Sequence, residues 1–246
     1  MRVIERKSLP TEEPYVVTGL PDIGLVGTIA ALHIIRQLDM EEMAYFESDA
    51  LPPVIVLHKG RLTMPVRIYG RDKLYIVTSE IAISPEVMPS LARNIVDYAI
   101  SKNAKAIIML GGLAVPNRLE IEKPKVYAVA TFDSLINDVK TLGVEPLDEG
   151  FVVGIHALIL RECAFRRIPA LLLLAQCHVQ YPDPGAAASI IETLNKFIGL
   201  NINVEPLLKE AESLRLKLRE LMRRTAATLS KIQKSHEYEV PPMMYV

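Results

Sequence analysis

The sequence contains no tryptophan and only two cysteines, Cys163 and Cys177, among 246 residues. Two cysteines in a chain of this size do not form the disulfide framework on which small secreted domains depend. We therefore expect a protein of the reducing cytoplasm, in which both thiols are small buried side chains. The absence of tryptophan and the scarcity of asparagine and glutamine fit a thermophile, whose proteins avoid labile side chains.

The sequence also lacks a long hydrophobic run and an excess of charge of one sign. The longest apolar stretch, Ile168 to Ala175, is far shorter than the roughly 20 residues that a membrane-spanning helix needs. The first residues, Met1 to Lys7, are charged and lack the apolar centre of a secretory signal. The formal net charge is −1, so there is no general attraction to nucleic acid or to an anionic membrane. We expect a soluble protein that recognises its partners locally.

The familiar motifs of catalysis and cofactor binding are missing. The turn Gly19 to Gly27 lies between an expected strand and helix, yet it contains neither G-x-G-x-x-G nor a Walker motif. No serine lies in a G-x-S-x-G turn, and Cys177 with His178 lacks the spacing of a zinc site. We therefore predict no catalytic residue, no cofactor and no bound metal. The histidines in or beside expected elements are predicted to be structural: His33, His58 and His156.

Two glycine-containing turns each allow two interpretations. The glycines of Gly19 to Gly27 could permit tight packing between a strand and a helix, or they could bind a small molecule. Gly111 and Gly112 follow a continuously apolar strand and allow the same two interpretations. Close packing explains both turns without a ligand, and a small-molecule-binding enzyme remains an alternative function.

The sequence does contain a regular alternation of β-rich and amphipathic helical segments from Tyr15 to about Ala175. This pattern predicts an α/β fold with a central mixed, largely parallel sheet. The runs Ala106 to Leu110 and Ala170 to Leu174 are continuously apolar, as central strands covered on both faces should be. Further strands are expected at 15–18, 54–57, 66–69, 74–78 and 126–130. Helices are expected at 27–38, 84–102, 131–142, 154–166 and 184–199, with Ser84 and Asp183 as N-caps before prolines.

A hydrophobic seam predicts one long helix from about Pro206 to Lys234. Its members recur alternately four and three positions apart, as in a heptad repeat: Leu207, Ala211, Leu214, Leu218, Leu221, Thr225, Thr228 and Ile232. Because the two threonines and the alanine make the seam imperfect for a free coiled coil, we expect the helix to pack on the body or on a sister subunit.

The same helix carries a basic stretch that could contact RNA or an acidic lipid surface: Arg215, Lys217, Arg219, Arg223 and Arg224. Glu212 and Glu220 lie among these residues, and aromatic residues are absent from the stretch. This mixture of charges favours a solvated helix face.

The last residues form a segment without helical or strand periodicity. Pro241 and Pro242 favour an extended conformation and prevent continuation of a helix. An extended chain from Ser235 onward would span roughly 35 to 40 Å at about 3.3 Å per residue. The segment ends in a hydrophobic residue, a tyrosine and a residue with a free carboxylate: Met244, Tyr245 and Val246. We expect this tail to dock on a partner, and an ordinary frayed terminus is the alternative.

Three segments together resemble the PAC2 family, whose members include the proteasome assembly chaperones. They are Val17 to Gly27, Leu110 to Gly112 and Tyr181 to Ala187, and the resemblance extends over about residues 10 to 235. It implies a three-layer α/β sandwich similar to that of purine nucleoside phosphorylases, no catalysis, and homo-oligomerisation, for which we expect a tetramer. We expect three parts: an α/β domain at 1–203, the long helix at 204–234 and a docking tail at 235–246.

Within this resemblance, the tail matches the hydrophobic–tyrosine–any motif at the carboxyl ends of proteasome activators and of some assembly chaperones. The motif implies that Met244 fills an apolar part of a pocket between neighbouring α subunits of the proteasome core particle. It also implies that Tyr245 wedges against the base of the gate and that the carboxylate of Val246 pairs with a pocket lysine. The whole chain resembles most the archaeal members that activate the proteasome without ATP. We therefore predict an ATP-independent proteasome activator, with an assembly chaperone for α-ring formation as the alternative.

Overall fold

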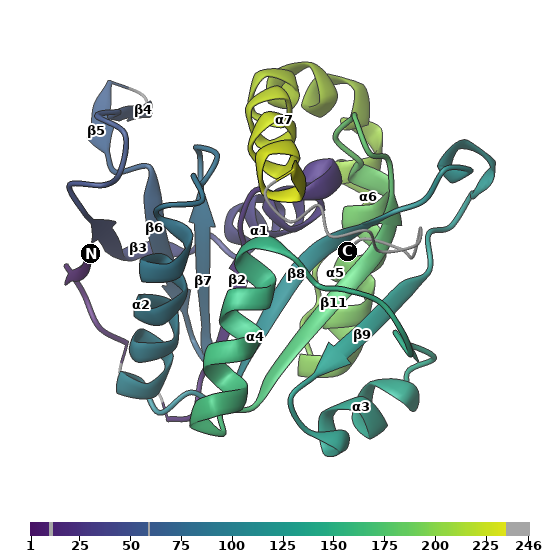
Figure 1. The fold of residues 1–246 in the computed structure, drawn as a ribbon, viewed down its shortest axis with the longest axis horizontal. Coiled ribbons are helices and arrows are strands. Elements are labelled where there is room, and N and C mark those ends of the chain that lie inside the picture. Colours follow the sequence, from purple (N-terminus) through teal and green to yellow (C-terminus); the bar gives the residue numbers. More distant parts are fainter. Residues whose placement is uncertain (10–11, 59, 235–246) are drawn as a thin grey trace.

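The structure, a computed structural model, describes residues 1–9, 12–58 and 60–234 (Figure 1). The strands in chain order are β1 (Arg2–Glu5), β2 (Tyr15–Gly19), β3 (Glu41–Glu47), β4 (Val56–His58), β5 (Arg61–Thr63), β6 (Val66–Arg71), β7 (Leu74–Ser79), β8 (Ala106–Ala114), β9 (Val126–Ala130), β10 (Glu145–Pro146) and β11 (Ala170–Cys177). The α-helices are α1 (Val26–Gln37), α2 (Met88–Ser101), α3 (Asp133–Lys140), α4 (Gly154–Arg166), α5 (Pro184–Ile198), α6 (Glu205–Lys209) and α7 (Ala211–Lys234). Two short 3-10 helices are η1 (Ile23–Leu25) and η2 (Arg118–Glu120).

Nine of the strands form one sheet with the order β1-β3-β6-β7-β2-β8-β11-β9-β10. In its middle, β2 is parallel to both β7 and β8, and β8 is parallel to β11. Toward the flanks, β1, β3, β6 and β7 pair antiparallel, as do β11 and β9. The predicted mixed sheet is confirmed, with three parallel pairs at its centre and a further parallel pair, β9 with β10, at one edge. The carboxyl ends of β2, β8 and β11 therefore meet at one edge, where open α/β sheets usually bind their ligands.

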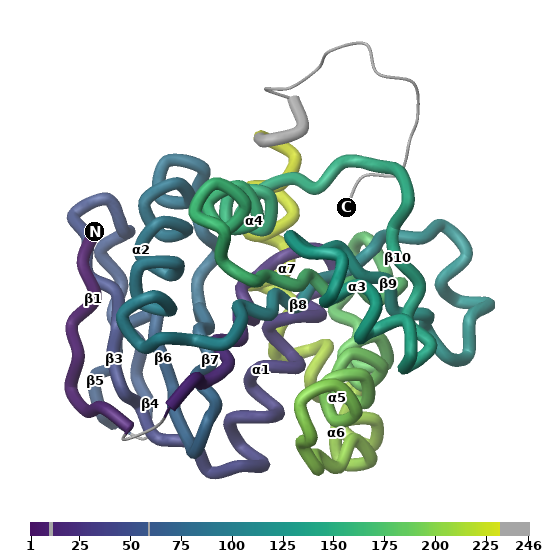
Figure 2. The backbone as a smooth tube through the Cα atoms, turned by 90° about the horizontal axis from the view of Figure 1, so that it is seen from below, coloured from purple at the N-terminus to yellow at the C-terminus, as the bar shows by residue number. Residues whose placement is uncertain are grey.

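Helices cover both faces of the sheet, which gives the three expected layers. The helices α2 and α4 pack on one face, and α1 and α5 pack on the other (Figure 2). Successive residues of β8 supply the two cores in turn. Ile107 and Met109 pack with α2 and α4, whereas Ile108 and Leu110 pack with α1 and α5. This alternation follows from the two-residue period of a strand and explains why the central strands are apolar throughout.

Two predicted helix starts have different outcomes. The N-cap at Asp183 is confirmed, because its carboxylate accepts a hydrogen bond from the Ala186 amide at 3.0 Å. The predicted start at Ser84 is wrong, because α2 begins at Met88. The Val87 amide donates to the Ser84 carbonyl oxygen over 3.0 Å, so the chain makes a turn before the helix.

The long carboxyl-terminal helix predicted from Pro206 to Lys234 is two helices. The short α6 ends at Lys209, and α7 begins at Ala211 after a turn at Glu210. This turn allows Leu207 to pack in the core beside α5 while Leu214 and Met222 of α7 pack in the same core. The seam forms the buried side of α7, which lies on the body of its own chain, and the side chain of the last seam residue, Ile232, is outside the described part. Among the described helices, none is both long enough and apolar enough to span a bilayer.

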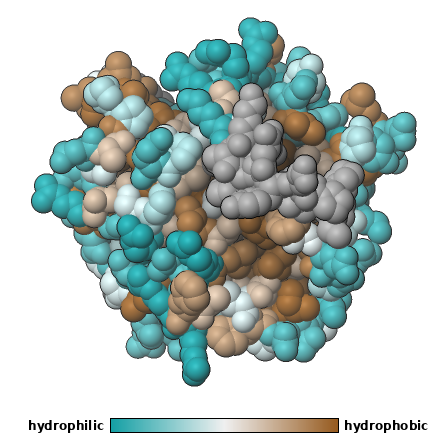
Figure 3. All heavy atoms as spheres, viewed as in Figure 1, coloured by the Kyte–Doolittle hydropathy of each residue, from teal (hydrophilic) through white to brown (hydrophobic). Residues whose placement is uncertain are grey.

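A separate hairpin of β4 and β5 projects from the edge of the body (Figure 1). We call residues 54–58 and 60–63 the hairpin arm. Its large apolar side chains are exposed, with 51% of Ile55, 66% of Leu57 and 69% of Leu62 accessible to solvent. A hydrophobic (brown) region lies at the upper left of Figure 3, where Figure 1 shows β4 and β5 in the same view. A two-stranded hairpin is only marginally stable on its own, so the stability of the hairpin arm depends on contacts outside the β4–β5 pair.

Candidate functional site

The residues predicted to dock on a partner, Met244, Tyr245 and Val246, lie outside the described residues, as does the whole segment 235–246. The described chain ends at Lys234, the last residue of α7. The other sequence candidates, which are the two glycine turns, the histidines and the cysteines, lie in the body and can be placed.

The three segments that carry the family resemblance meet at the carboxyl ends of β2, β8 and β11. The turn after β2 is fixed to both of its neighbours by hydrogen bonds. The amide of Gly112 on β8 donates to Oδ2 of Asp22 at 2.9 Å. The amide of Asp183, before α5, donates to the carbonyl oxygen of Gly24 at 2.9 Å. We call this group of residues the strand-end cluster: Asp22, Gly24, Gly27, Gly111, Gly112, Arg118, His156, Cys177 and Asp183.

The glycines of the strand-end cluster are required by close packing. A Cβ atom at Gly27 would collide with the carbonyl oxygen of Leu110, and one at Gly112 would collide with that of Ile23. Gly24 has a φ of +65°, a conformation that other residues rarely adopt. The protein's own atoms thus occupy the space that a side chain at these positions would need. This packing favours the structural interpretation of both glycine segments. The prediction that Gly111 and Gly112 follow the strand is wrong, because both lie within β8 and pair with Leu174 and Ala175 of β11.

A buried acid–base pair lies beside the turn. Asp22 is 6% exposed, and its Oδ2 lies 3.2 Å from Nε2 of His156 in the first turn of α4. Burial raises the pKa of the Asp22 carboxyl above its ordinary value, although His156 and the Gly112 amide oppose this effect. Within the described chain, Asp22 Oδ1 and His156 Nδ1 have no hydrogen-bond partner. A Cβ atom at Gly111 would lie 2.7 Å from Asp22 Oδ2, so this glycine makes room for the pair.

A buried ion pair connects the loop after β8 to the start of α5. Arg118, in η2, donates from Nε to Asp183 Oδ2 at 2.7 Å and from Nη2 to Asp183 Oδ1 at 3.0 Å. The same carboxylate accepts the amides of His178 and Ala186. These charge-assisted bonds satisfy a carboxylate whose side chain is only 1% exposed. The sequence predicts Asp183 as an N-cap but does not indicate Arg118 as its partner.

The two thiols and His33 have structural surroundings. Both cysteines are free and buried, as predicted. Burial raises the pKa of the Cys163 thiol to about 12 and also raises the pKa of Cys177, so neither is an activated nucleophile. His33 Nε2 lies 2.7 Å from the carbonyl oxygen of Asn203 and connects α1 to the segment before α6. Across the described residues, no group of three or more His, Cys, Asp and Glu side chains could hold a metal ion.

The sequence of this chain matches a family model and a protein of known sequence over most of its length. The model of the PAC2 family matches residues 16–222. An uncharacterized protein of Methanocaldococcus jannaschii is 36% identical over 236 residues, which cover 96% of this chain and 97% of that protein.

Two solved structures from Pyrococcus furiosus share the fold. PbaA, described as an archaeal homolog of proteasome-assembly chaperone, has a TM-score of 0.85 and 32% identity, over 92% of this chain and 98% of that chain. PbaB, described as an archaeal proteasome activator, has a TM-score of 0.75 and 25% identity, over 89% of this chain and 97% of that chain.

These values correct one expectation from the sequence, namely that the chain is most similar to the archaeal activators. Of the two Pyrococcus proteins, PbaA is the more similar in both identity and TM-score. The match to the family model includes the turn after β2, the glycines of β8 and the start of α5, which are the three segments that form the strand-end cluster. The chain belongs to the PAC2 family.

Proposed function

We propose that this protein binds the proteasome core particle through its carboxyl-terminal residues and opens the gate of the α ring without ATP. One observation carries the proposal. The chain shares its fold over 89% of its length with PbaB, described as an archaeal proteasome activator, and its sequence ends in Met244, Tyr245 and Val246. The body supports membership of a proteasome-related group, and the tail supplies residues suited to docking.

Each of the three tail residues has its own task in this proposal. Met244 fills an apolar part of the pocket between neighbouring α subunits, where its unbranched side chain adapts to an irregular wall. Tyr245 supplies the largest buried area, and its hydroxyl group forms a hydrogen bond at the solvent-exposed end of the pocket. The carboxylate of Val246 pairs with a pocket lysine in a charge-assisted contact.

We propose further that the protein acts as a homo-oligomer, with a tetramer as the expected size. Several tails on one particle raise the effective concentration of each tail at the α ring, so weak individual contacts suffice. The exposed apolar side chains of the hairpin arm support self-association, because a patch of this kind typically marks a protein contact. Ile55, Leu57 and Leu62 would lose their exposure to water in such an interface.

The proposed function requires no reaction at the strand-end cluster. Gly27 and Gly112 are packed against carbonyl oxygens, and burial keeps the thiol of Cys177 protonated. Asp22 and His156 are engaged with each other in the interior. These features support a binding protein over the alternative of a small-molecule-binding enzyme.

The second candidate function is a chaperone for assembly of the α ring, in which the same tail guides α subunits before the particle is complete. A specific observation favours it. The chain is more similar to PbaA, described as a homolog of proteasome-assembly chaperone, than to PbaB. Both candidates use the same docking residues and differ in the state of the proteasome that is bound.

The test compares the full chain with a chain that lacks Met244, Tyr245 and Val246, using isolated core particles of an archaeal proteasome. Surface plasmon resonance measures binding, and a fluorogenic peptide measures gate opening. We expect both binding and stimulated hydrolysis to be lost with the three residues. Unchanged binding would overturn the docking proposal. Binding by the full chain without stimulation of mature particles would favour the chaperone function over activation.

A further inference from the structure

A cavity of about 470 Å³ lies between α1, β6 and α7, and it shares no lining residue with the strand-end cluster. Its wall is mainly apolar, with Ile29, Leu32 and Ile35 from α1 opposite Leu214 and Leu218 from α7. Sites for small molecules typically enclose about 300–1,000 Å³ and have mostly apolar walls with a few polar groups. The cavity thus has the size and the lining of a ligand site.

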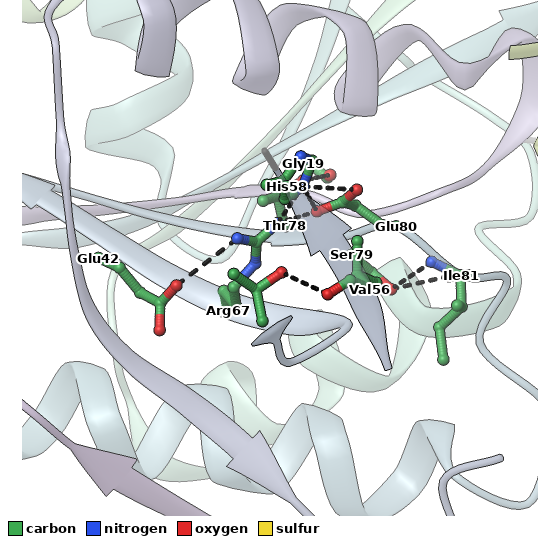
Figure 4. Close-up of polar contacts among 10 residues, drawn as sticks. Gly19, Glu42, Val56, His58, Arg67, Thr78, Ser79, Glu80 and Ile81 are labelled. Carbon is green, nitrogen blue, oxygen red and sulfur yellow. Dashed lines mark hydrogen bonds and ion pairs between the residues drawn. The ribbon is translucent and has the colours of Figure 1, made fainter. Parts of the chain in front are cut away.

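The polar side of this cavity is a charged network around the buried side chain of Arg67 (Figure 4). The side chain of Arg67 on β6 is 4% exposed and lies between two carboxylates. Its Nη1 is 3.5 Å from Glu42 Oε2, and its Nη2 contacts Glu80 directly. His58 of the hairpin arm approaches Glu80 Oε1 to 2.8 Å. The carboxylates offset the charge of Arg67, while its Nε has no hydrogen-bond partner in the described chain and keeps one N–H group available.

Two cations from different helices line the same cavity. They are Arg36 on α1 and Lys217 on α7, and both are exposed to solvent. Neither forms an ion pair within the described residues. By contrast, three other basic residues of α7 are each paired with a glutamate: Arg215 with Glu212, and Arg223 and Arg224 with Glu220. Lys217 and Arg36 therefore present charges at the cavity that no carboxylate of the described chain offsets, whereas Arg219, which also has no ion pair there, does not line it.

We infer that this cavity binds an apolar molecule that carries a carboxylate, of the size of a medium-chain fatty acid or of a short apolar peptide with a free carboxyl terminus. The apolar wall of α1 and α7 takes up the hydrocarbon part, since burying each CH₂ group is favourable by about 0.8 kcal/mol. Arg36 and Lys217 attract the carboxylate from two sides. An amine of the same shape meets two like charges instead, so the site discriminates by the sign of charge.

The first test is titration of the full chain with sodium octanoate by isothermal titration calorimetry, with octylamine as the probe of opposite charge. We expect saturable binding of one octanoate per chain and at least about tenfold weaker binding of octylamine, the effect of one well-placed charge pair. Lys217→Glu and Arg36→Glu should each weaken octanoate binding about tenfold. Arg219→Glu is the control, because Arg219 is exposed on the same helix but does not line the cavity.

A second titration identifies the source of the carboxylate, with the peptide acetyl-Met-Tyr-Val as a free acid and as an amide. Competition of the acid, but not of the amide, with octanoate would assign the site to a polypeptide carboxyl terminus. Binding of octanoate alone would assign it to a free acyl carboxylate. Absence of saturable binding of both acids, or equal affinities in wild type and Lys217→Glu, would overturn the inference. Either result is independent of the proposed docking on the proteasome, because that proposal is tested by removing Met244, Tyr245 and Val246.

Discussion

Arg118 contacts both carboxylate oxygens of Asp183, with Nε 2.7 Å from Oδ2 and Nη2 3.0 Å from Oδ1. The side chains are 10% and 1% exposed, so the pair is almost fully withdrawn from water. It fixes the loop after β8 against the first turn of α5, beside the Gly24 carbonyl that accepts the Asp183 amide. One of the three segments that identify the family is thus fixed to the loop after β8 by a buried ion pair whose arginine lies outside all three segments.

Replacing Arg118 by methionine should destabilise the fold strongly, because the substitution leaves the buried carboxylate of Asp183 without its cation. Breaking one side of a buried ion pair typically costs about 3–5 kcal/mol in the free energy of unfolding. Urea denaturation followed by circular dichroism measures the change. Lys123→Met is the control, since Lys123 pairs with Glu192 but is 75% exposed. Equal losses in the two variants would contradict the role assigned to Arg118.

Gly27→Ala should destabilise the protein without any ligand present, because the new Cβ atom would collide with the Leu110 carbonyl oxygen of the neighbouring strand. Gly143→Ala is the comparison. Gly143 has a φ of +82°, and an added Cβ atom there would meet no other atom. The substitution therefore costs only the strain of an alanine in the left-handed conformation, about 1–2 kcal/mol in the free energy of unfolding. Thermal unfolding should give a larger loss for Gly27→Ala. A stable Gly27→Ala protein would instead support a cradle for a ligand.

The Asp22→Asn variant should become more stable relative to wild type as the pH rises above 3.8, the ordinary pKa of the carboxyl. Burial raises the pKa of Asp22 in the folded protein. Below pH 3.8 the carboxyl is protonated in both the folded and the unfolded chain, so wild type has its full stability there. As the pH rises, the unfolded chain loses this proton first, and wild type loses stability until the pH passes the raised pKa. Asparagine has no proton to lose.

Urea denaturation of both proteins at a series of pH values measures this difference, in which the titrating groups that do not contact Asp22 cancel. His156→Gln provides a second check. Because His156 opposes the rise in the pKa of Asp22, its removal should extend the loss of stability to higher pH and enlarge the total loss. A wild type that gains stability over Asp22→Asn with rising pH would show that the carboxylate is stabilised in its charged form.

The central part of the fold is predictable from local sequence. The strands β8 and β11 are buried on both faces, so their continuous apolar runs identify them. The strand β3 is not predictable in the same way, because Glu41, Glu42 and Glu47 at its ends mask the buried Met43 and Phe46. The turn at Glu210 could not be predicted either, because the heptad spacing of the seam continues from α6 into α7 without interruption.

The strand-end cluster depends on contacts that no spacing rule predicts. Asp22 lies in a segment that the sequence singles out, but its partner His156 is 134 positions away. Arg118 and Asp183 are separated by 65 positions. Such partners meet only because the order of strands brings the ends of β2, β8 and β11 together, and that order is a property of the whole chain. The segments of the cluster can therefore be predicted from the sequence, whereas the side chains that fix them cannot.

Leu57→Lys combined with Leu62→Asp, which places opposite charges across the β4–β5 pair, should reduce the size of the particle in solution if the hairpin arm forms the contact between copies. Both side chains are more than 60% exposed in the single chain, so the substitutions remove little packing within it. Size-exclusion chromatography with light scattering should give a smaller mass for this variant at the same concentration. The control is Leu119→Asp, an 89% exposed leucine on the loop after β8. An unchanged mass would exclude the arm as the interface.

Tyr245→Ala should reproduce most of the effect of removing the last three residues on binding to the proteasome core particle. Buried aromatic anchors carry much of the free energy of an interface, and truncating one typically costs about 2 kcal/mol or more, which is about 30-fold in affinity. Tyr181→Ala is the control, because Tyr181 is 63% exposed on the body. Surface plasmon resonance on immobilised core particles measures both affinities, and amidation of the Val246 carboxylate tests the charge-assisted contact separately. If Tyr245→Ala binds as wild type does while the amidated chain fails, the carboxylate and not the aromatic ring is the main anchor.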